Sequence, residues 1–206
     1  LIAADVAQAA TTINSTNACA YGANIGWVNA RGDEANGVVI GEFVCSGSIY
    51  AANAGWINLG DGTPANGIRY QNNSGTDYGV NHVGLGTLRG CAYGANIGWV
   101  NFENTGAPKV DLATGKLSGC AWSANCGWIS LSNAAAVVQT ATIAAGADTD
   151  SDGIADAWEL TYTGTLTAFT ASSDTDGDGL SDQQEALADT NPLDPNDTLE
   201  ITSYAH

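Results

Sequence analysis

Short apolar segments separated by Gly, Asn, Asp and Pro fill residues 18–132, and this pattern predicts a mainly β body. Residues 38–44 and 109–117 have the composition of strands, and the second of these segments contains a turn at Ala113-Thr114-Gly115. Turn-forming residues also dominate 61–66 and 71–77. Because turn signals recur about every ten residues, we expect a succession of short antiparallel strands.

An internal repeat organises this body. Residues 19–29 and 91–101 are identical, and residues 47–58 and 119–130 are related to them. The shared order is aromatic, small, Ala, Asn, any residue, Gly, Trp and a β-branched residue. Four such Gly-Trp units predict a repeat architecture. The sequence leaves open whether the units form a sandwich, a short solenoid or a closed ring.

Each unit is predicted to be a β-hairpin. In the first unit Gly22-Ala23-Asn24 fits a three-residue loop, in which Asn tolerates the positive φ that such loops need. This register places Tyr21 opposite Ile25 and Cys19 opposite Trp27 on a bulky face, and Ala20 opposite Gly26 on a nearly bare face. We expect the four repeated Trp residues to form a shared core. The alternative is a row of exposed aromatic side chains that stack on sugars.

The formal net charge of −17 makes nucleic acid and anionic membranes poor partners and makes cations the natural ones. The most apolar stretches, 1–10 and 134–145, are short and interrupted by polar residues, so we expect no membrane span. No basic segment precedes an apolar core at Leu1, as a signal peptide would require. We interpret the chain as the mature form of a secreted or cell-surface protein, although a cytosolic protein would look the same here.

Cysteine usage favours an oxidising compartment. No Cys-x-x-Cys pair exists, so a tetrathiolate zinc site is not expected. Recurrent Cys in a Gly-rich, strand-rich chain predicts disulfides, with an odd count that leaves one thiol over. The disulfide candidates, whose pairing stays open, are Cys19, Cys45, Cys91, Cys120 and Cys126.

The composition changes abruptly at Asp148, after which thirteen acids and no Lys or Arg occur up to Asp197. Residues 148–159 place oxygen-bearing residues at loop positions 1, 3, 5, 9 and 12, Gly at position 6 and a backbone carbonyl at position 7. This spacing is typical of an EF-hand-type Ca²⁺ loop. The ligands predicted for the first loop are Asp148, Asp150, Asp152, Ile154 through its carbonyl, Asp156 and Glu159.

Residues 174–185 repeat every element of this loop 26 positions later. The ligands predicted for the second loop are Asp174, Asp176, Asp178, Leu180 through its carbonyl, Asp182 and Glu185. Two full matches favour two calcium sites over a solvated acidic tail, because random acids would not keep Gly and Glu in phase twice. Magnesium is disfavoured, since it prefers few protein ligands and several waters. A short helix is predicted after each loop, with Ile154, Trp158 and Tyr162 forming one apolar stripe.

Residues 174–185, followed by Asp189-Thr190-Asn191-Pro192-Leu193-Asp194-Pro195, resemble bacterial thrombospondin type 3 repeats, with dockerin modules as more distant kin. The resemblance covers about the last sixty residues and implies calcium binding. It also implies additional metal oxygens from Asp189, Asn191 and Asp194. The Gly-Trp units are similar to segments of other secreted bacterial surface proteins, but this similarity implies no activity.

The sequence offers no convincing catalytic set. Only His82 and His206 are available, and nothing singles out a pair of carboxylates. We expect four parts: an N-terminal arm over 1–17, a β domain over 18–145, a tandem calcium-loop segment over 146–197, and a C-terminal strand over 198–206. The leading hypothesis is a non-enzymatic, calcium-stabilised structural protein of the cell surface or extracellular matrix. Its terminal strands could assemble a filament or pair within the monomer, and the sequence leaves this open. The alternative is a carbohydrate-binding or adhesion module.

Overall fold

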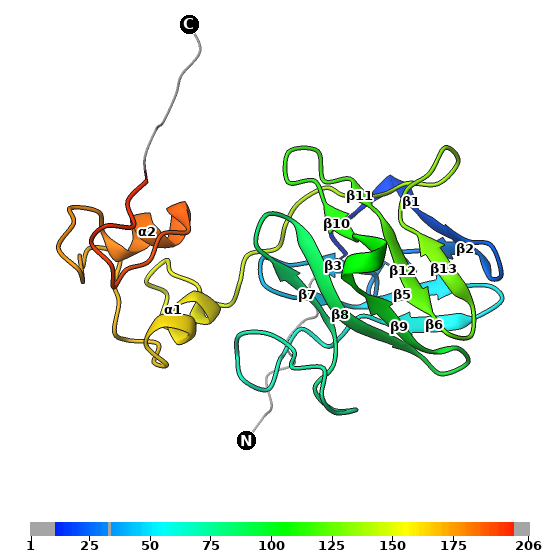
Figure 1. Cartoon of the computed structure of the whole chain (residues 1–206), viewed down its shortest axis with the longest axis horizontal. Coiled ribbons are helices and arrows are strands. Elements are labelled where there is room, and N and C mark those ends of the chain that lie inside the picture. Colours follow the sequence, from blue (N-terminus) through cyan, green and yellow to red (C-terminus); the bar gives the residue numbers. More distant parts are fainter. Residues whose placement is uncertain (1–10, 33, 200–206) are drawn as a thin grey trace, which may run out of the picture. The chain divides into compact units, whose positions relative to one another are not determined.

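The structure is a computed structural model that describes residues 11–32 and 34–199. The chain divides into two compact units between Ala145 and Gly146. Among the described residues, the strands lie in the first unit and the two α-helices in the second (Figure 1). Neither of these helices has the length and apolar character that crossing a membrane would require.

Most strands are two to five residues long, as the dense turn signals predict. The strands of the described residues are β1 (Ile13–Gly22), β2 (Gly26–Asn29), β3 (Val39–Ile40), β4 (Cys45–Ser46), β5 (Ser48–Ala51), β6 (Gly55–Asn58), β7 (Val80–Val83), β8 (Thr87–Gly94), β9 (Gly98–Phe102), β10 (Lys109–Val110), β11 (Leu117–Ser118), β12 (Cys120–Ser123), β13 (Gly127–Ser130) and β14 (Val138–Thr140). The 3₁₀ turn η1 (Asn104–Gly106) follows β9.

The four Gly-Trp units are four hairpins that close into a ring. The hairpins are β1–β2, β5–β6, β8–β9 and β12–β13. Neighbouring hairpins pair through β2–β5, β6–β8, β9–β12 and β13–β1, all antiparallel. The result is an eight-stranded closed barrel. The mainly β prediction is confirmed, and the arrangement is the closed ring instead of a sandwich or solenoid.

The barrel consists of two similar halves. Residues 19–59 and 91–131 correspond at a spacing of 72 positions, and each half contributes two hairpins with a short strand pair between them, β3–β4 or β10–β11. Strand β7 extends the second half by pairing with β8, with Val80 opposite Gly90. Strand β14 occupies the same place beside β1, with Val138 opposite Ala18. The last strand of the unit therefore pairs with the first, which joins the two ends of the barrel sequence.

The predicted terminal segments lie largely outside the described residues. Residues 13–17 of the predicted N-terminal arm belong to β1, while residues 1–10 are not described. Of the predicted C-terminal strand, only Thr198 and Leu199 are described, and neither is in a strand.

The hairpin register differs from the prediction by one loop position. Tyr21 lies opposite Trp27, and Gly22 lies opposite Gly26, so the loop consists of residues 23–25. Gly26 adopts the positive φ of +76°, and the corresponding Gly of every other hairpin has a φ between +72° and +77°. Glycine takes this conformation at lower cost than asparagine, which explains why the loop ends at Gly26. The one-residue shift leaves the membership of the two strand faces unchanged.

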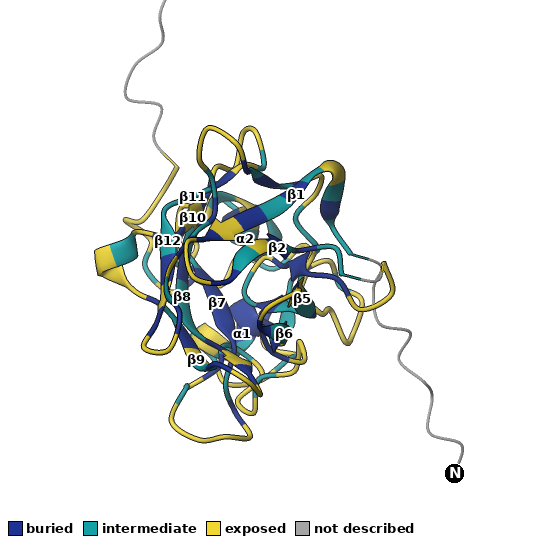
Figure 2. Ribbon diagram, turned by 90° about the vertical axis from the view of Figure 1, so that its right-hand side faces the viewer, coloured by how far each residue is buried: buried dark blue, intermediate teal, exposed yellow. Residues whose placement is uncertain are grey.

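The prediction that the repeated Trp residues form the core is wrong. Trp27, Trp56, Trp99 and Trp128 are 42 % to 53 % exposed, and each packs edge-on or tilted against an aromatic ring across its hairpin at centroid distances of 4.9 to 5.5 Å. The small and β-branched residues of the opposite face are buried, and Figure 2 shows buried and exposed positions interspersed along the barrel strands. An eight-stranded barrel is just wide enough for medium-sized side chains to fill it, so the indoles must point outward.

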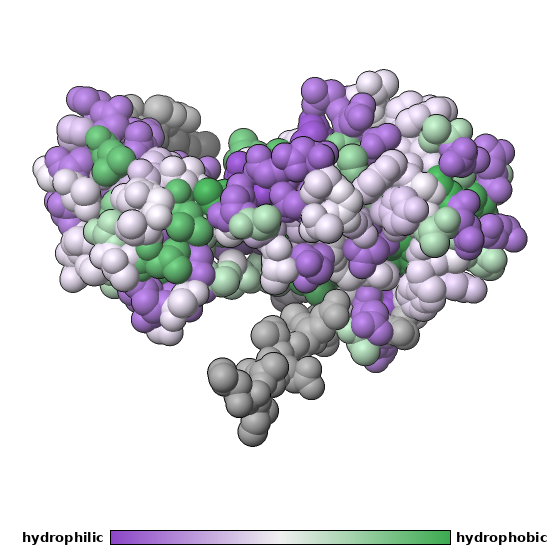
Figure 3. Space-filling view, turned by 90° about the horizontal axis from the view of Figure 1, so that it is seen from below, coloured by the Kyte–Doolittle hydropathy of each residue, from purple (hydrophilic) through white to green (hydrophobic). Residues whose placement is uncertain are grey.

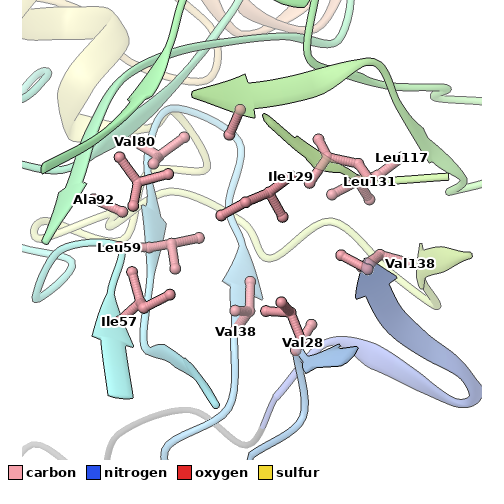
Figure 4. Close-up of a cluster of buried hydrophobic side chains, with 14 of the residues drawn as sticks. Val28, Val38, Ile57, Leu59, Val80, Ala92, Leu117, Ile129, Leu131 and Val138 are labelled. Carbon is pink, nitrogen blue, oxygen red and sulfur yellow. The ribbon is translucent and has the colours of Figure 1, made fainter. Parts of the chain in front are cut away.

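The barrel interior is a packed aliphatic core. Val28, Ile57, Val80, Ala92, Ile129 and Val138 point toward one another from different strands (Figure 4). The cavity that remains among the core residues is about 40 Å³ and almost wholly apolar. This volume is far below that of a typical ligand pocket, so a ligand of this unit must bind on the outer surface.

The third residue of each hairpin loop folds back and closes one end of the barrel. Ile25 is buried in this way, and a Cβ added at Gly22 would lie 2.8 Å from Ile25 Cγ1. In the third hairpin a Cβ at Gly94 would lie 2.9 Å from Ile97 Cγ1. The glycine before each of these loops therefore makes room for the loop isoleucine.

The asparagine of each loop connects neighbouring hairpins. Its side-chain amide donates to the carbonyl of the third loop residue in the adjacent hairpin. The four hydrogen bonds run from Asn24 Nδ2 to Cys126 O (3.1 Å), from Asn53 Nδ2 to Ile25 O (3.3 Å), from Asn96 Nδ2 to Ala54 O (3.2 Å) and from Asn125 Nδ2 to Ile97 O (3.0 Å). Together they form a closed ring, which explains why every repeat carries Asn at this position.

The predicted disulfides are absent, and all five cysteines are free thiols. Cys91, Cys19 and Cys120 lie on β8, β1 and β12, and in the barrel order β9 separates β8 from β12 while β13 separates β12 from β1. Two strand spacings amount to about 9.6 Å, which exceeds the Cα separation of about 7 Å that a disulfide can bridge. Cys45 faces the interior and Cys126 lies in a hairpin loop, both buried. Recurrence in the repeat reflects one equivalent position per hairpin and not pairing.

Candidate calcium-binding segment

Both acidic loops of the second unit fold around the carboxylate at loop position 1. In the first loop, Asp148 Oδ1 and Oδ2 accept hydrogen bonds from the backbone N–H of Asp152 (3.2 Å) and Gly153 (3.0 Å). In the second loop, Asp174 Oδ1 and Oδ2 accept from Gly177 (2.7 Å) and Gly179 (3.1 Å). These bonds wrap the chain around one point in both repeats.

The sharp bend depends on left-handed backbone at two loop positions. Position 6 is Gly153, with a φ of +89°, and Gly179, with a φ of +101°. Position 4 is also left-handed, at Ser151 (φ +63°) and Gly177 (φ +80°). The position-6 glycines follow from the predicted loop spacing, but the strained serine at position 4 does not.

The bend gathers three aspartates in each loop. One carboxylate oxygen from each of Asp148, Asp150 and Asp152 lies within 4.8 Å of the other two. Asp174, Asp176 and Asp178 form an equivalent triad in the second loop. At position 7 the backbone N–H of Ile154 and Leu180 donates to the position-5 aspartate at 2.9 and 2.7 Å. Three negative charges at this separation repel one another, and a cation between them would offset this repulsion.

The glutamates at position 12 are buried, and the only side-chain hydrogen bond to them among the described residues runs from the Thr190 hydroxyl to Glu185 Oε1 at 3.4 Å. The side chains of Glu159 and Glu185 are fully buried, and among the described residues neither Glu159 oxygen nor Glu185 Oε2 has a hydrogen-bond partner. Asp152, Asp176 and Asp178 each have one oxygen in the same condition. Buried carboxylate oxygens normally have partners, so these atoms fit a cation that the oxygens would surround.

The same crowding shifts the acidity of both glutamates. Burial, followed by the negative charge of the aspartates in the same loop, raises the pKa of Glu159 to about 7. Burial and the aspartates of the second loop likewise raise the pKa of Glu185 to about 7. Without a cation, therefore, the ionised form of each glutamate is disfavoured in the folded loop at neutral pH.

The aspartates at position 9 have partners of a different kind. Asp156 accepts from the N–H (2.7 Å) and the hydroxyl (2.6 Å) of Thr149. Asp182 accepts from the N–H and the hydroxyl of Thr175, both at 2.9 Å. Each aspartate thus ties the start of its loop to the start of the following helix. The sequence signal for this contact is the Asp-Thr-Asp at the start of both loops, which the EF-hand ligand spacing alone does not include.

Short helices follow the loops, as predicted. Helix α1 (Asp156–Tyr162) places Trp158 against Tyr162 and Phe169, with ring centroids 4.9 and 5.1 Å apart. Helix α2 (Asp182–Ala188) begins with a capping box, in which Ser181 and Gln184 each bond the backbone N–H of the other. Gln183 Nε2 also donates to the Gly153 carbonyl at 3.4 Å, which links the two repeats.

The additional candidate ligands lie in the turn after α2. Asp189 ends the helix with a φ of +58°. Asn191 Oδ1 accepts from the N–H of Leu193 at 3.1 Å, and Asp194 Oδ1 accepts from the N–H and the side-chain amide of Asn196. These hydrogen bonds lower the pKa of Asp194. Neither aspartate triad of the described residues includes these three residues.

Two loops with clustered aspartates, a glycine bend and a buried glutamate before a short helix define this unit as a tandem of EF-hand-type loops. Comparison with protein families matches residues 148–165 and 174–195 to the bacterial TSP3 repeat. The second unit therefore carries two bacterial TSP3 repeats, which confirms the resemblance there. Such repeats are calcium-binding structural modules of extracellular proteins. No curated protein and no solved structure matches the chain.

Proposed function

We propose that the chain is a secreted or cell-surface structural protein whose C-terminal unit is folded by two Ca²⁺ ions. The buried carboxylates of Glu159 and Glu185 carry this proposal, because both Glu159 oxygens and Glu185 Oε2 lack a hydrogen-bond partner among the described residues. The first ion would be held by Asp148, Asp150, Asp152, the carbonyl of Ile154 and Glu159. The second would be held by Asp174, Asp176, Asp178, the carbonyl of Leu180 and Glu185. Asp156 and Asp182 support each site through their bonds to Thr149 and Thr175.

The energetics favour a structural role for the ions. The second unit has a small apolar core around Trp158 and Phe169, and it must hold thirteen acids without a Lys or Arg between Asp148 and Asp197. Cations supply the missing counter-charge. Extracellular calcium modules bind with dissociation constants of about 10⁻⁴ to 10⁻³ M. Free calcium at about a hundred times the dissociation constant stabilises the folded state by about 2.7 kcal/mol per site.

Hydrogen–deuterium exchange of the full chain tests this role. We expect amides of α1 and α2 to exchange much faster in EDTA than in calcium, while the barrel strands stay protected. Glu185→Gln removes one charge from the second loop and should weaken calcium binding at that site. Asp111→Asn is the matched control, because Asp111 is an acid of the barrel unit that lies outside both aspartate triads. Protection of α1 and α2 that ignores EDTA would refute the structural role.

The proposal also includes self-association of the protein through the ends of the chain. A terminal strand that pairs with a neighbouring chain would extend a sheet and build a filament. Size-exclusion chromatography and negative-stain microscopy, with and without calcium, test this assembly. A protein that stays monomeric at high concentration would end the filament hypothesis.

Adhesion through the barrel surface is the second candidate function. The observation that favours it is the outward orientation of the aromatic pairs, such as Tyr21 with Trp27 and Tyr50 with Trp56. Exposed indole rings are preferred contact residues because they bury a large apolar area and lose little conformational entropy. In Figure 3 much of the visible surface has intermediate or hydrophilic character, and the hydrophobic residues form separate groups.

A further inference from the structure

The connection between β6 and β7 breaks the internal symmetry of the barrel. It spans residues 59–79, whereas the corresponding connection from β13 to β14 spans only 131–137. The longer connection is held in place by its own polar groups. Asp77 accepts from the N–H of Ala65 and of Gln71, and Asn72 Oδ1 accepts from the N–H of Gly79 and of Cys91. The connection therefore forms a fixed wall beside the third hairpin.

A cleft of about 460 Å³ lies between this wall and the third hairpin. This volume falls within the range of small-molecule sites. Its lining combines two aromatic rings with side-chain amides and hydroxyls and contains no Lys, Arg, Asp, Glu or His. The residues that matter for binding are Asn73, Ser74, Tyr78, Trp99 and Asn101.

Trp99 offers one rigid aromatic face to the cleft. Its indole packs edge-to-face against Tyr93 at 4.9 Å and against Tyr78 at 5.1 Å. Tyr78 comes from the longer connection, so this support is specific to the third hairpin. Trp99 is 42 % exposed, and these contacts hold its exposed part in a fixed orientation. The negative face of an aromatic ring attracts the polarised C–H bonds on one side of a pyranose ring.

Polar groups near Trp99 are free to bind hydroxyls. The Asn101 Oδ1 atom accepts a bond from Cys91 Sγ at 3.2 Å, and among the described residues its Nδ2 has no acceptor. The side chain of Asn73 forms no hydrogen bond within the described part of the chain and is exposed. Amides supply both donors and acceptors, which matches the alternating donor and acceptor character of sugar hydroxyls.

We propose that this cleft is a binding site for a neutral saccharide, with Trp99 as the stacking platform and Asn73 and Asn101 as hydroxyl ligands. An anionic ligand does not fit, because no cationic side chain lines the cleft and the net charge is −17. A quaternary ammonium requires several ring faces around it, whereas these three rings pack against one another. The site belongs to the barrel unit and does not depend on the proposed role of calcium.

The chain contains its own matched control for this proposal. Residues 19–29 and 91–101 are identical, so Trp27 has the same local sequence as Trp99 but lacks the longer connection beside it. A Trp99→Ala variant and a Trp27→Ala variant therefore differ in the cleft and not in the hairpin. Asn73→Ala tests the cleft independently, because Asn73 holds no part of the fold.

Isothermal titration calorimetry of the full chain in calcium buffer, with neutral hexasaccharides of β-1,4-glucose, β-1,3-glucose, β-1,4-mannose and β-1,4-N-acetylglucosamine, is the test. We expect at least one probe to bind with a dissociation constant at or below about 1 mM. Trp99→Ala should weaken that binding about tenfold or more and Asn73→Ala about threefold, while Trp27→Ala changes it less than about twofold. No binding by any probe at millimolar concentration, an equal loss in both Trp variants, or unchanged binding in Asn73→Ala would overturn the proposal. A negative result here would leave the EDTA experiment unaffected.

Discussion

The side-chain amide of Asn24 donates a 3.1 Å hydrogen bond to the carbonyl of Cys126, and this contact joins the first hairpin of the barrel to the last. Three equivalent bonds complete the ring, so each hairpin is both donor and acceptor. Asn24 and its partner Cys126 are 102 residues apart in sequence, and Asn53 and its partner Ile25 are 28 residues apart. The ring therefore stabilises the closed barrel specifically and not the separate hairpins.

Replacing one ring asparagine should destabilise the barrel by about 0.5 to 1.5 kcal/mol, the net contribution of a typical hydrogen bond. We expect similar losses for Asn24→Ala and Asn96→Ala, because the two loops have the same sequence and geometry. Asn24→Asp keeps the shape but removes the donor, so it should cost at least as much. Urea denaturation at fixed calcium measures the change. A wild-type midpoint in all three variants would show that the ring contributes nothing.

The outward orientation of the indoles predicts an unusual order of mutational effects at two adjacent residues. Ile57 is fully buried, and Ile57→Ala should cost about 2 to 5 kcal/mol. Trp56 is 47 % exposed, and Trp56→Ala should cost about 0.5 to 1.5 kcal/mol, mainly through its lost contact with Tyr50. Thermal or urea unfolding of the two variants compares them. A larger loss for Trp56→Ala would contradict the barrel orientation.

The calcium-free second unit should lose stability as the pH rises. The pKa of both Glu159 and Glu185 in the folded chain is raised to about 7 from an ordinary value of 4.5. Between these values the folded state holds protons that the unfolded state has released, so folding is favoured below about pH 4.5 and this advantage is gone above about pH 7. Hydrogen–deuterium exchange in EDTA should show better relative protection of α1 and α2 at pH 5 than at pH 8, after correction for the intrinsic exchange rate.

Saturating calcium provides the control for this pH dependence. Protons and calcium compete for the same carboxylates, so the dependence should weaken or reverse when calcium is present. A pH profile that is identical in EDTA and in calcium would show that the two glutamates do not face a metal site.

The free cysteines predict that reductant has no effect on the fold. Titration of the denatured chain without reductant should find five thiols, and dithiothreitol should leave the free energy of unfolding unchanged. In the native protein Cys45 should be unreactive, because burial raises the pKa of its thiol to about 12. Fewer than five thiols in protein that was purified without reductant and without added oxidant would support the disulfide prediction.

The local features of this protein could be predicted from sequence because neighbouring residues decide them. Asp148 and Gly153 fix the course of the first calcium loop within six residues, and the second loop repeats the same rule. The Gly-Trp hairpins are equally local, since a turn residue and a few alternating side chains suffice. Even so, both Asn24 and Gly26 could take the positive φ, and only the structure shows that Gly26 does.

The sequence by itself determined that four hairpins and two acidic loops exist, because spacing and turn chemistry act over a few residues. Tertiary structure alone decided which hairpin face is buried. Both faces carry apolar residues, such as Val28 on one and Trp27 on the other, so alternation could not choose between them. The closing of the barrel determines which face is buried, because the interior of an eight-stranded ring admits valine and isoleucine but has no room for eight aromatic rings. The closed barrel also keeps the cysteines of the repeats apart and brings Asn24 to Cys126. No short stretch of sequence encodes these long-range relationships.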